Sequence, residues 1–103
     1  MIFIPKILVI GYYHPGDFEH NLEVYMSEDK PKYPNYIKKV ENLVTGTGEF
    51  KFYAIYEVPE SKIYESIQHL QKRYAFYASR LQNYEYEIEL VGPMEDAIAL
   101  FMS

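Results

Sequence analysis

Two histidines and an aspartate recur at intervals of three residues, at His14, Asp17 and His20. Two imidazoles and one carboxylate form a ligand set that suits zinc or non-haem iron. Asp17 is also a favourable helix N-cap, and its oxygen does not readily serve both a backbone N–H group and a metal. We therefore expect a capped helix with two exposed histidines and no metal or other cofactor. A metal site of His14, Asp17 and His20 is kept as the alternative.

Three glutamates alternate with apolar residues further along the chain, at Glu85, Glu87 and Glu89. The alternation places them on one face of a strand, with neighbours about 7 Å apart. If that face lines an enclosed space, Glu87 could act as a general acid or base. If it faces water at a sheet edge, the charges discourage pairing with another chain. We favour the second interpretation, because this strand is expected at an edge.

Tyrosines gather on the two segments that are expected to form the central strands; they are Tyr12, Tyr13, Tyr53 and Tyr56. A phenol can bind a substrate carbonyl or donate a proton, but more often it adds apolar area to a core or an interface. Tyr12, Tyr53 and Tyr56 are the candidates for ligand contact, and His14, Tyr53 and Glu87 are the candidates for proton transfer. The sequence has no P-loop, nucleophile elbow, dinucleotide fingerprint or zincin motif.

Length and composition indicate what class of protein carries these side chains. The chain of 103 residues fits one domain over 1–103, and its apolar content of 49% predicts folding rather than disorder. A formal net charge of −5 argues against a nucleic-acid partner. The absence of cysteine suits a reducing compartment, and no apolar stretch approaches the roughly 20 residues of a membrane span. These features predict a soluble, cytoplasmic protein with no membrane partner.

The apolar pattern predicts four strands and two helices. Short β-branched and aromatic runs predict strands at 7–10, 36–44, 50–58 and 84–90. Helical spacing predicts one helix from Asp17 to about 27 and a longer one capped by Ser61 and closed by Asn83. A last helical turn or two is expected at 94–101.

This order of elements predicts an α+β domain with a β-α-β-β-α-β sandwich. Four antiparallel strands carry both helices on one face, and right-handed crossovers place the first and third strands in the middle. These central runs are apolar on both faces, so the face without helices needs a cover. A second copy of the chain is the simplest cover, because twofold dimers are the commonest assembly.

The chain resembles the dimeric α/β-barrel superfamily, in which two ferredoxin-like sheets pack face to face. The resemblance rests on the element order over nearly the whole chain, on Thr45-Gly46-Thr47-Gly48 leading into the run Phe52–Glu57, and on the capped helix from Ser61. It implies a homodimer through the sheet face, most like the stand-alone members of the superfamily. The superfamily includes monooxygenases, isomerases and ligand-sensing domains, and none of their catalytic signatures occurs here.

Two hypotheses for the function follow. The first is a homodimeric module that binds a small apolar or aromatic ligand or serves in assembly. The second is a small enzyme resembling cofactor-free monooxygenases or isomerases, with a pocket between sheet and helices. An enclosed pocket that contains His14 or a glutamate would favour the enzyme.

Overall fold

The computed structural model describes residues 4–14, 16, 18–45, 51–92 and 95. The described elements are, in chain order, β1 (Lys6–Tyr12), α1 (Phe18–Tyr25), β2 (Lys38–Val44), β3 (Lys51–Glu57), the short 3-10 helix η2 (Glu60–Lys62), α2 (Ile63–Arg80) and β4 (Glu85–Val91). None of the described helices has the length and apolar character needed to cross a membrane.

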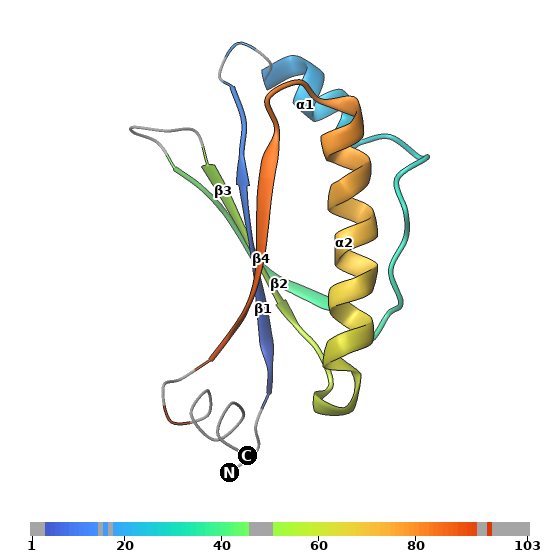
Figure 1. The fold of residues 1–103 in the computed structure, drawn as a ribbon, viewed down its shortest axis with the longest axis vertical. Coiled ribbons are helices and arrows are strands. Elements are labelled where there is room, and N and C mark those ends of the chain that lie inside the picture. Colours follow the sequence, from blue (N-terminus) through green and yellow to red (C-terminus); the bar gives the residue numbers. More distant parts are fainter. Residues whose placement is uncertain (1–3, 15, 17, 46–50, 93–94, 96–103) are drawn as a thin grey trace.

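The four strands form one antiparallel sheet in the order β2-β3-β1-β4. The prediction that the first and third strands are central is therefore confirmed, and β4 lies at an edge as expected. Both helices lie on the same side of the sheet (Figure 1). The chain is an α+β protein whose four-stranded antiparallel sheet and two helices are compatible with a ferredoxin-like fold.

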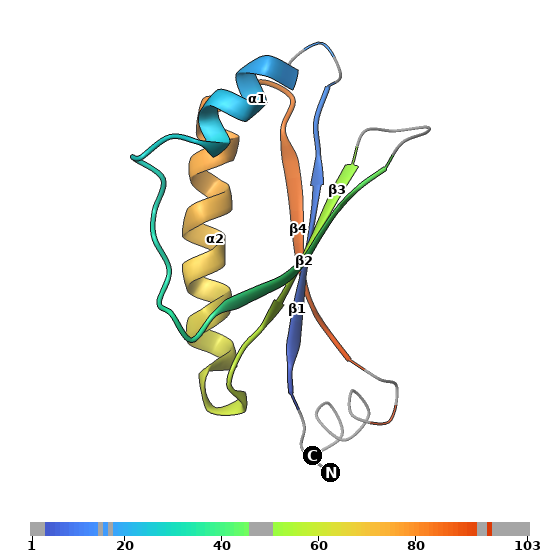
Figure 2. The ribbon, with the colours of Figure 1, turned by 180° about the vertical axis from the view of Figure 1, so that it is seen from behind.

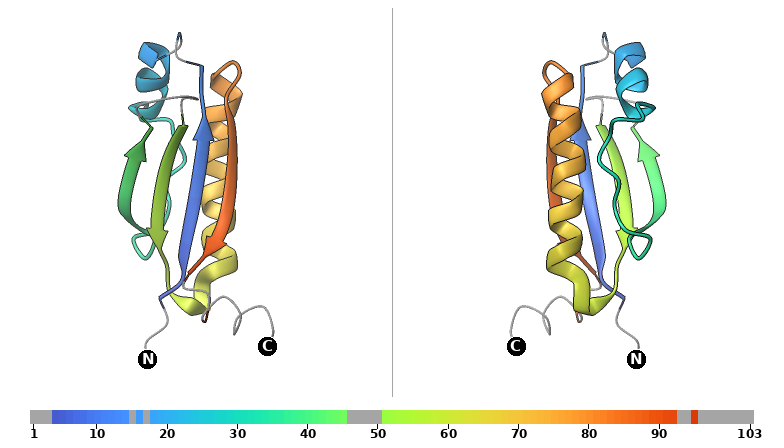
Figure 3. Two further views of the ribbon diagram at one scale, coloured as in Figure 1. Left: turned by 90° about the vertical axis from the view of Figure 1, so that its left-hand side faces the viewer. Right: turned by 90° about the vertical axis from the view of Figure 1, so that its right-hand side faces the viewer.

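The helices and the loop between α1 and β2 together cover this side of the sheet. Figure 3 shows α2 behind β1 and β4, with α1 near one end of the sheet on the side of β2 and β3. The loop 26–37 runs alongside α2 (Figure 2). It carries Tyr33, whose ring meets the ring of Tyr56 edge to face at 5.8 Å between centroids. The half of the sheet formed by β2 and β3 is thus covered by the short helix α1 and this loop rather than by a long helix.

The core lies between the sheet and this cover. Alternate residues of the central strands point into it, so that Ile7, Val9, Ala54 and Tyr56 have no exposed surface. Leu70 of α2 meets them and is equally buried. Their burial supplies the main favourable contribution to folding.

The opposite side of the sheet, which we call the open face, has none of the described helices over it. Its central residues are Leu8 and Ile10 of β1, opposite Ile55 and Tyr53 of β3, and all four are half-buried. The central strands β1 and β3 therefore have one face that is fully buried, whereas the residues on their other face are half-buried.

The starts of β1 and β4 differ from the predictions by one residue, and the starts of β2 and α2 differ for local structural reasons. The strand predicted at 36–44 begins at Lys38, because Ile37 N–H donates to Pro34 O at 3.1 Å and closes a turn. The prediction that Ser61 caps the second helix is wrong. Residues 60–62 form a 3-10 turn closed by Lys62 N–H to Pro59 O at 2.9 Å, so α2 starts at Ile63 without a side-chain cap.

The described part of α1 ends at Tyr25, two residues before the predicted end. Asn83 follows α2 with φ of 60°, a left-handed conformation that asparagine tolerates and that helps the chain to turn into β4. The predicted cap Asp17, the turn residues 46–48 and, apart from Glu95, the predicted last turn at 94–101 lie outside the described residues.

Candidate functional site

A cavity of about 270 Å³ lies on the helix side of the sheet, where α1, α2 and the strands β2 and β3 meet. Its walls combine aromatic, aliphatic, amide and cationic side chains. The described lining residues are Tyr13, Phe18, Asn21, Leu22, Tyr25, Lys30, Lys39, Asn42, Val44, Phe52, Arg73, Tyr74 and Tyr77. Of these residues, only Tyr13 belongs to the four tyrosines that the sequence pattern indicated as possible functional groups.

Helical periodicity explains the contribution of α1. Phe18, Asn21, Leu22 and Tyr25 are spaced by three, four and seven residues from the first, which places them on one face of the helix. Phe18 is 52% exposed and Leu22 is 44% exposed, so both lie at the rim, whereas Asn21 is buried. The cavity therefore opens to solvent past apolar side chains.

A bulge in β2 explains how this strand reaches the cavity. Lys39 pairs with Tyr56 and Asn42 pairs with Ala54, and both partners point toward the helices. In a regular strand, residues three apart point to opposite faces. The register shift between Lys39 and Glu41 restores both to the same side.

Aromatic rings form the floor of the cavity. Tyr25 meets Tyr77 edge to face at 4.8 Å between centroids, and it meets Phe52 in the same way at 5.8 Å. Phe52 stacks on Tyr74 at 6.2 Å. Such interlocked rings are favourable to each other beyond the area that they bury, and they give the cavity a firm wall.

Gly11 makes room for this floor. A Cβ atom at Gly11 would collide with the ring of Phe52, which is only 8% exposed. The absence of a side chain on β1 therefore lets the Phe52 ring lie across the strand beside the cavity.

Arg73 is fixed from two directions. Its Nε donates to the Tyr77 hydroxyl at 3.1 Å, and its guanidinium lies 4.5 Å from the ring centroid of Tyr33. The first contact comes from the same helix, one turn away, and the second from the loop 26–37. The guanidinium is thus held at the cavity while its terminal Nη groups are left to donate elsewhere.

Lys30 and Lys39 bring two further cations to the same walls. Lys30 Nζ donates to Tyr25 O at 2.7 Å, at the carboxyl end of α1, and Lys39 Nζ lies 5.5 Å from the ring centroid of Tyr56. Withdrawal from water lowers the pKa of both lysines, and the charge of Arg73 lowers it further. Lys39 as a whole residue is exposed, so water weakens the effect of its surroundings on this pKa.

These three cations have no acidic counterpart among the described lining residues. The two ion pairs of the described chain, Lys62 with Glu65 and His20 with Glu23, lie elsewhere. A positive cluster has therefore formed in a chain whose net charge is −5. Such a cluster attracts an anion.

The predicted ligand-contact tyrosines lie on two different faces. Tyr56 is buried on the helix side and its hydroxyl is 2.7 Å from that of Tyr74; burial raises the pKa of both phenols. Tyr12 and Tyr53 belong to the open face. The structure therefore brings Tyr12 and Tyr53 to one surface and separates them from Tyr56.

The three glutamates of β4 lie on the open face at the sheet edge and are exposed. Glu87 pairs with Ile10, which also pairs with Tyr53 on its other side. Two strand spacings, or about 10 Å, therefore separate the backbones of Glu87 and Tyr53. The row therefore lies exposed at a sheet edge, beside the apolar centre of the open face.

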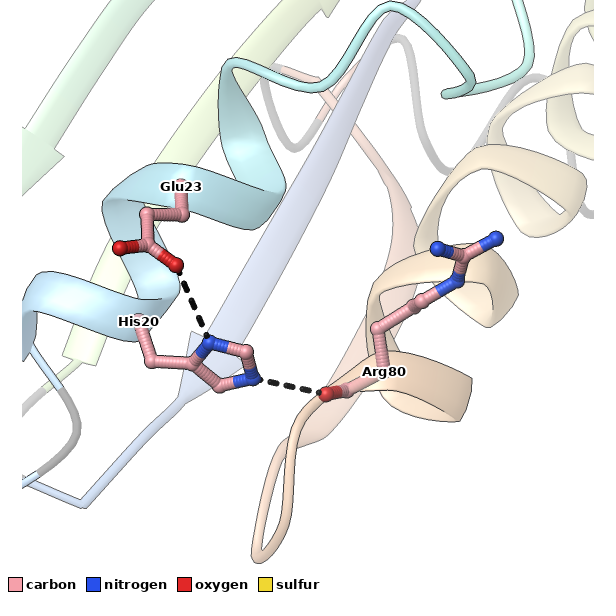
Figure 4. A network of polar contacts seen from close by, with 3 residues as sticks. All are labelled: His20, Glu23 and Arg80. Carbon is pink, nitrogen blue, oxygen red and sulfur yellow. Dashed lines mark hydrogen bonds and ion pairs between the residues drawn. The ribbon is translucent and has the colours of Figure 1, made fainter.

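His14 and His20 make local contacts. His14 Nδ1 accepts a hydrogen bond from Gly16 N–H at 3.1 Å. His20 lies between the Arg80 carbonyl oxygen at 3.2 Å and the Glu23 carboxylate at 3.6 Å, and so connects α1 to the end of α2 (Figure 4). Within the described part of the chain no three metal-ligating side chains come together, and Asp17 is not part of it.

No protein-family model, curated protein or solved structure matches this chain. The resemblance to the dimeric α/β-barrel superfamily accordingly has the element order and the sheet as its basis, without support from a relative.

Proposed function

We propose that this protein is a small-ligand-binding module that works as a homodimer in the cytoplasm. The observation that carries the proposal is the cavity of about 270 Å³ between the helices and the sheet. A cavity of about 150 Å³ suffices to hold benzene, so this one accommodates a ring with a substituent. Exposed Phe18, Leu22 and Val44 at its walls offer an apolar entrance.

The homodimer is supported by the open face. Leu8, Ile10, Tyr53 and Ile55 form a continuous half-buried centre on it, with cross-strand neighbours in register. The described helices α1 and α2 cover the other side, and apolar surface that stays in water favours association. Two copies that pack through this face would form the arrangement of a dimeric α/β barrel.

The enzymatic alternative has no comparable support. No histidine or glutamate is among the described residues that line the cavity. His14 contacts its own loop, and Glu87 and Tyr53 are separated by β1. Among the cavity phenols, the Tyr74 hydroxyl pairs with that of Tyr56, and the Tyr77 hydroxyl accepts a hydrogen bond from Arg73. A binding role needs none of these groups to transfer a proton.

Native mass spectrometry of freshly purified protein tests both parts of the proposal. We expect a dimer and either a retained small molecule or an apo form that gains mass with one added aromatic compound per subunit. A monomer at micromolar concentration would contradict the dimer. A chain that neither retains nor takes up any compound of a broad aromatic panel would contradict the binding role.

A further inference from the structure

We propose that the cavity selects a small organic anion, an aromatic carboxylate, whose ring lies on the tyrosine floor and whose charge is held by Lys39 and Arg73 with Lys30 nearby. This inference rests on the proposed binding function and adds the chemical class of the ligand. It draws on the arrangement of charge around the cavity.

The three cations are close enough to affect one another. Arg73 perturbs both lysines electrostatically, and Lys30 also perturbs Lys39. Like charges held together without a carboxylate are unfavourable in the absence of an anion. They come from three separate elements, the loop 26–37, β2 and α2, so the cluster is a product of the fold rather than of a basic stretch of sequence.

The orientation of Arg73 favours a carboxylate. A planar guanidinium recognises a planar carboxylate through paired N–H donors. Its Nε is engaged by Tyr77 and its face by Tyr33, which leaves the outer Nη groups as donors. Holding the side chain in advance reduces the conformational entropy lost on binding.

The remaining walls favour an aromatic body. Tyr25, Phe52, Tyr74 and Tyr77 present ring faces and edges within one network of contacts. A free inorganic anion would leave this surface unused. An aromatic carboxylate fits both parts of the cavity. Its ring would pack against the aromatic side chains, and its charge would be bound by the cations.

Binding of benzoate and of benzyl alcohol to the full chain, followed by NMR titration, tests the inference. The two probes have similar size, and only benzoate is charged. We expect benzoate to bind at least about ten-fold more tightly, because hydrogen bonds to charged groups are stronger than neutral ones. Added salt should weaken benzoate binding and leave benzyl alcohol unchanged.

Adjacent lysines of β2 provide a matched pair of variants. Lys39→Met should weaken benzoate binding by about ten-fold and leave benzyl alcohol within about three-fold. Lys38→Met makes the same change of net charge on the open face, since Lys38 pairs with Glu57, and should alter neither affinity. Arg73→Gln, compared with exposed Lys72→Gln on the same helix, gives a second pair.

The outcomes separate the two proposals. Equal affinity for the two probes, or an equal loss in Lys38→Met and Lys39→Met, would overturn the anion inference while the binding function stands. Failure of both probes to bind would overturn the anion inference, whereas the binding function would fall only if the broad aromatic panel also failed to bind.

Discussion

The two faces of the sheet come from the same strands and have opposite characters. The face toward the helices buries Ile7, Val9 and Tyr56 completely and contains the cavity. The open face leaves Ile10 and Tyr53 half-buried and ends in a row of exposed glutamates. The difference shows that side-chain alternation along a strand can separate a buried side that contains a cavity from a partly exposed side within one small domain.

The largest expected effect is the loss of a ring from the buried face. Phe52→Ala should lower the free energy of unfolding by about 3–5 kcal/mol, because Phe52 stacks on Tyr74 and Tyr84 in the core. Tyr53→Ala, the next residue on the open face, should cost less than half as much in dilute solution. Urea unfolding measures both, and equal losses would remove the distinction between the faces.

Charge insertion at neighbouring positions of β1 sharpens the comparison. Ile10→Lys should keep the fold and weaken the dimer by about 100-fold or more, since it places an unpaired charge in the proposed seam. Val9→Lys should instead destabilise the fold, because Val9 has no exposed surface. Sedimentation with circular dichroism distinguishes these results. An Ile10→Lys protein that associates like the parent would show that the dimer uses another surface.

Alkaline pH should act on the helix-facing side. Burial raises the pKa of Tyr56 and Tyr84 in the folded chain, whereas an unfolded tyrosine ionises near pH 10. Stability is therefore fully present below that pH and falls as pH rises, by about 1.4 kcal/mol per pH unit for each such tyrosine. Urea unfolding between pH 8 and about 11 measures the slope. Tyr56→Phe should flatten it, and an unchanged slope would contradict the burial argument.

The smallest effect is expected at the edge of the open face. Glu87→Gln should change the free energy of unfolding by less than about 0.5 kcal/mol and the dimer affinity by less than about three-fold, since Glu87 is exposed. Sedimentation at several protein concentrations provides the check. A ten-fold change in affinity would instead place this carboxylate inside the seam.

The fold could be predicted from the sequence because the spacing of apolar residues differs between helices and strands. The alternation of Glu85, Glu87 and Glu89 with apolar residues predicted the strand β4, and the order of elements placed this strand at an edge. The long apolar stripe predicted α2. The prediction that Ser61 caps α2 was wrong because a serine shortly after a proline and before a helix is typical of an N-cap, whereas here the chain first makes a 3-10 turn. Local pattern does not distinguish these two starts.

The cavity was much harder to predict. Lys30, Lys39 and Arg73 lie far apart in sequence, and each is typical of a solvated surface when considered alone. The bulge that turns Lys39 and Asn42 to one side has no distinct sequence signal. Adjacent lysines at 38 and 39 of a strand point to opposite faces, but the sequence does not show which of the two faces the helices until strand pairing is known.

The most direct test of the account is to map where benzoate binds, by following backbone amide and Arg73 Nε–H resonances of the folded protein during titration. The account predicts that the largest shifts occur at Arg73, Tyr77, Lys39 and Asn42 around the cavity. Shifts confined to Ile10, Tyr53 and Ile55 on the open face would contradict it.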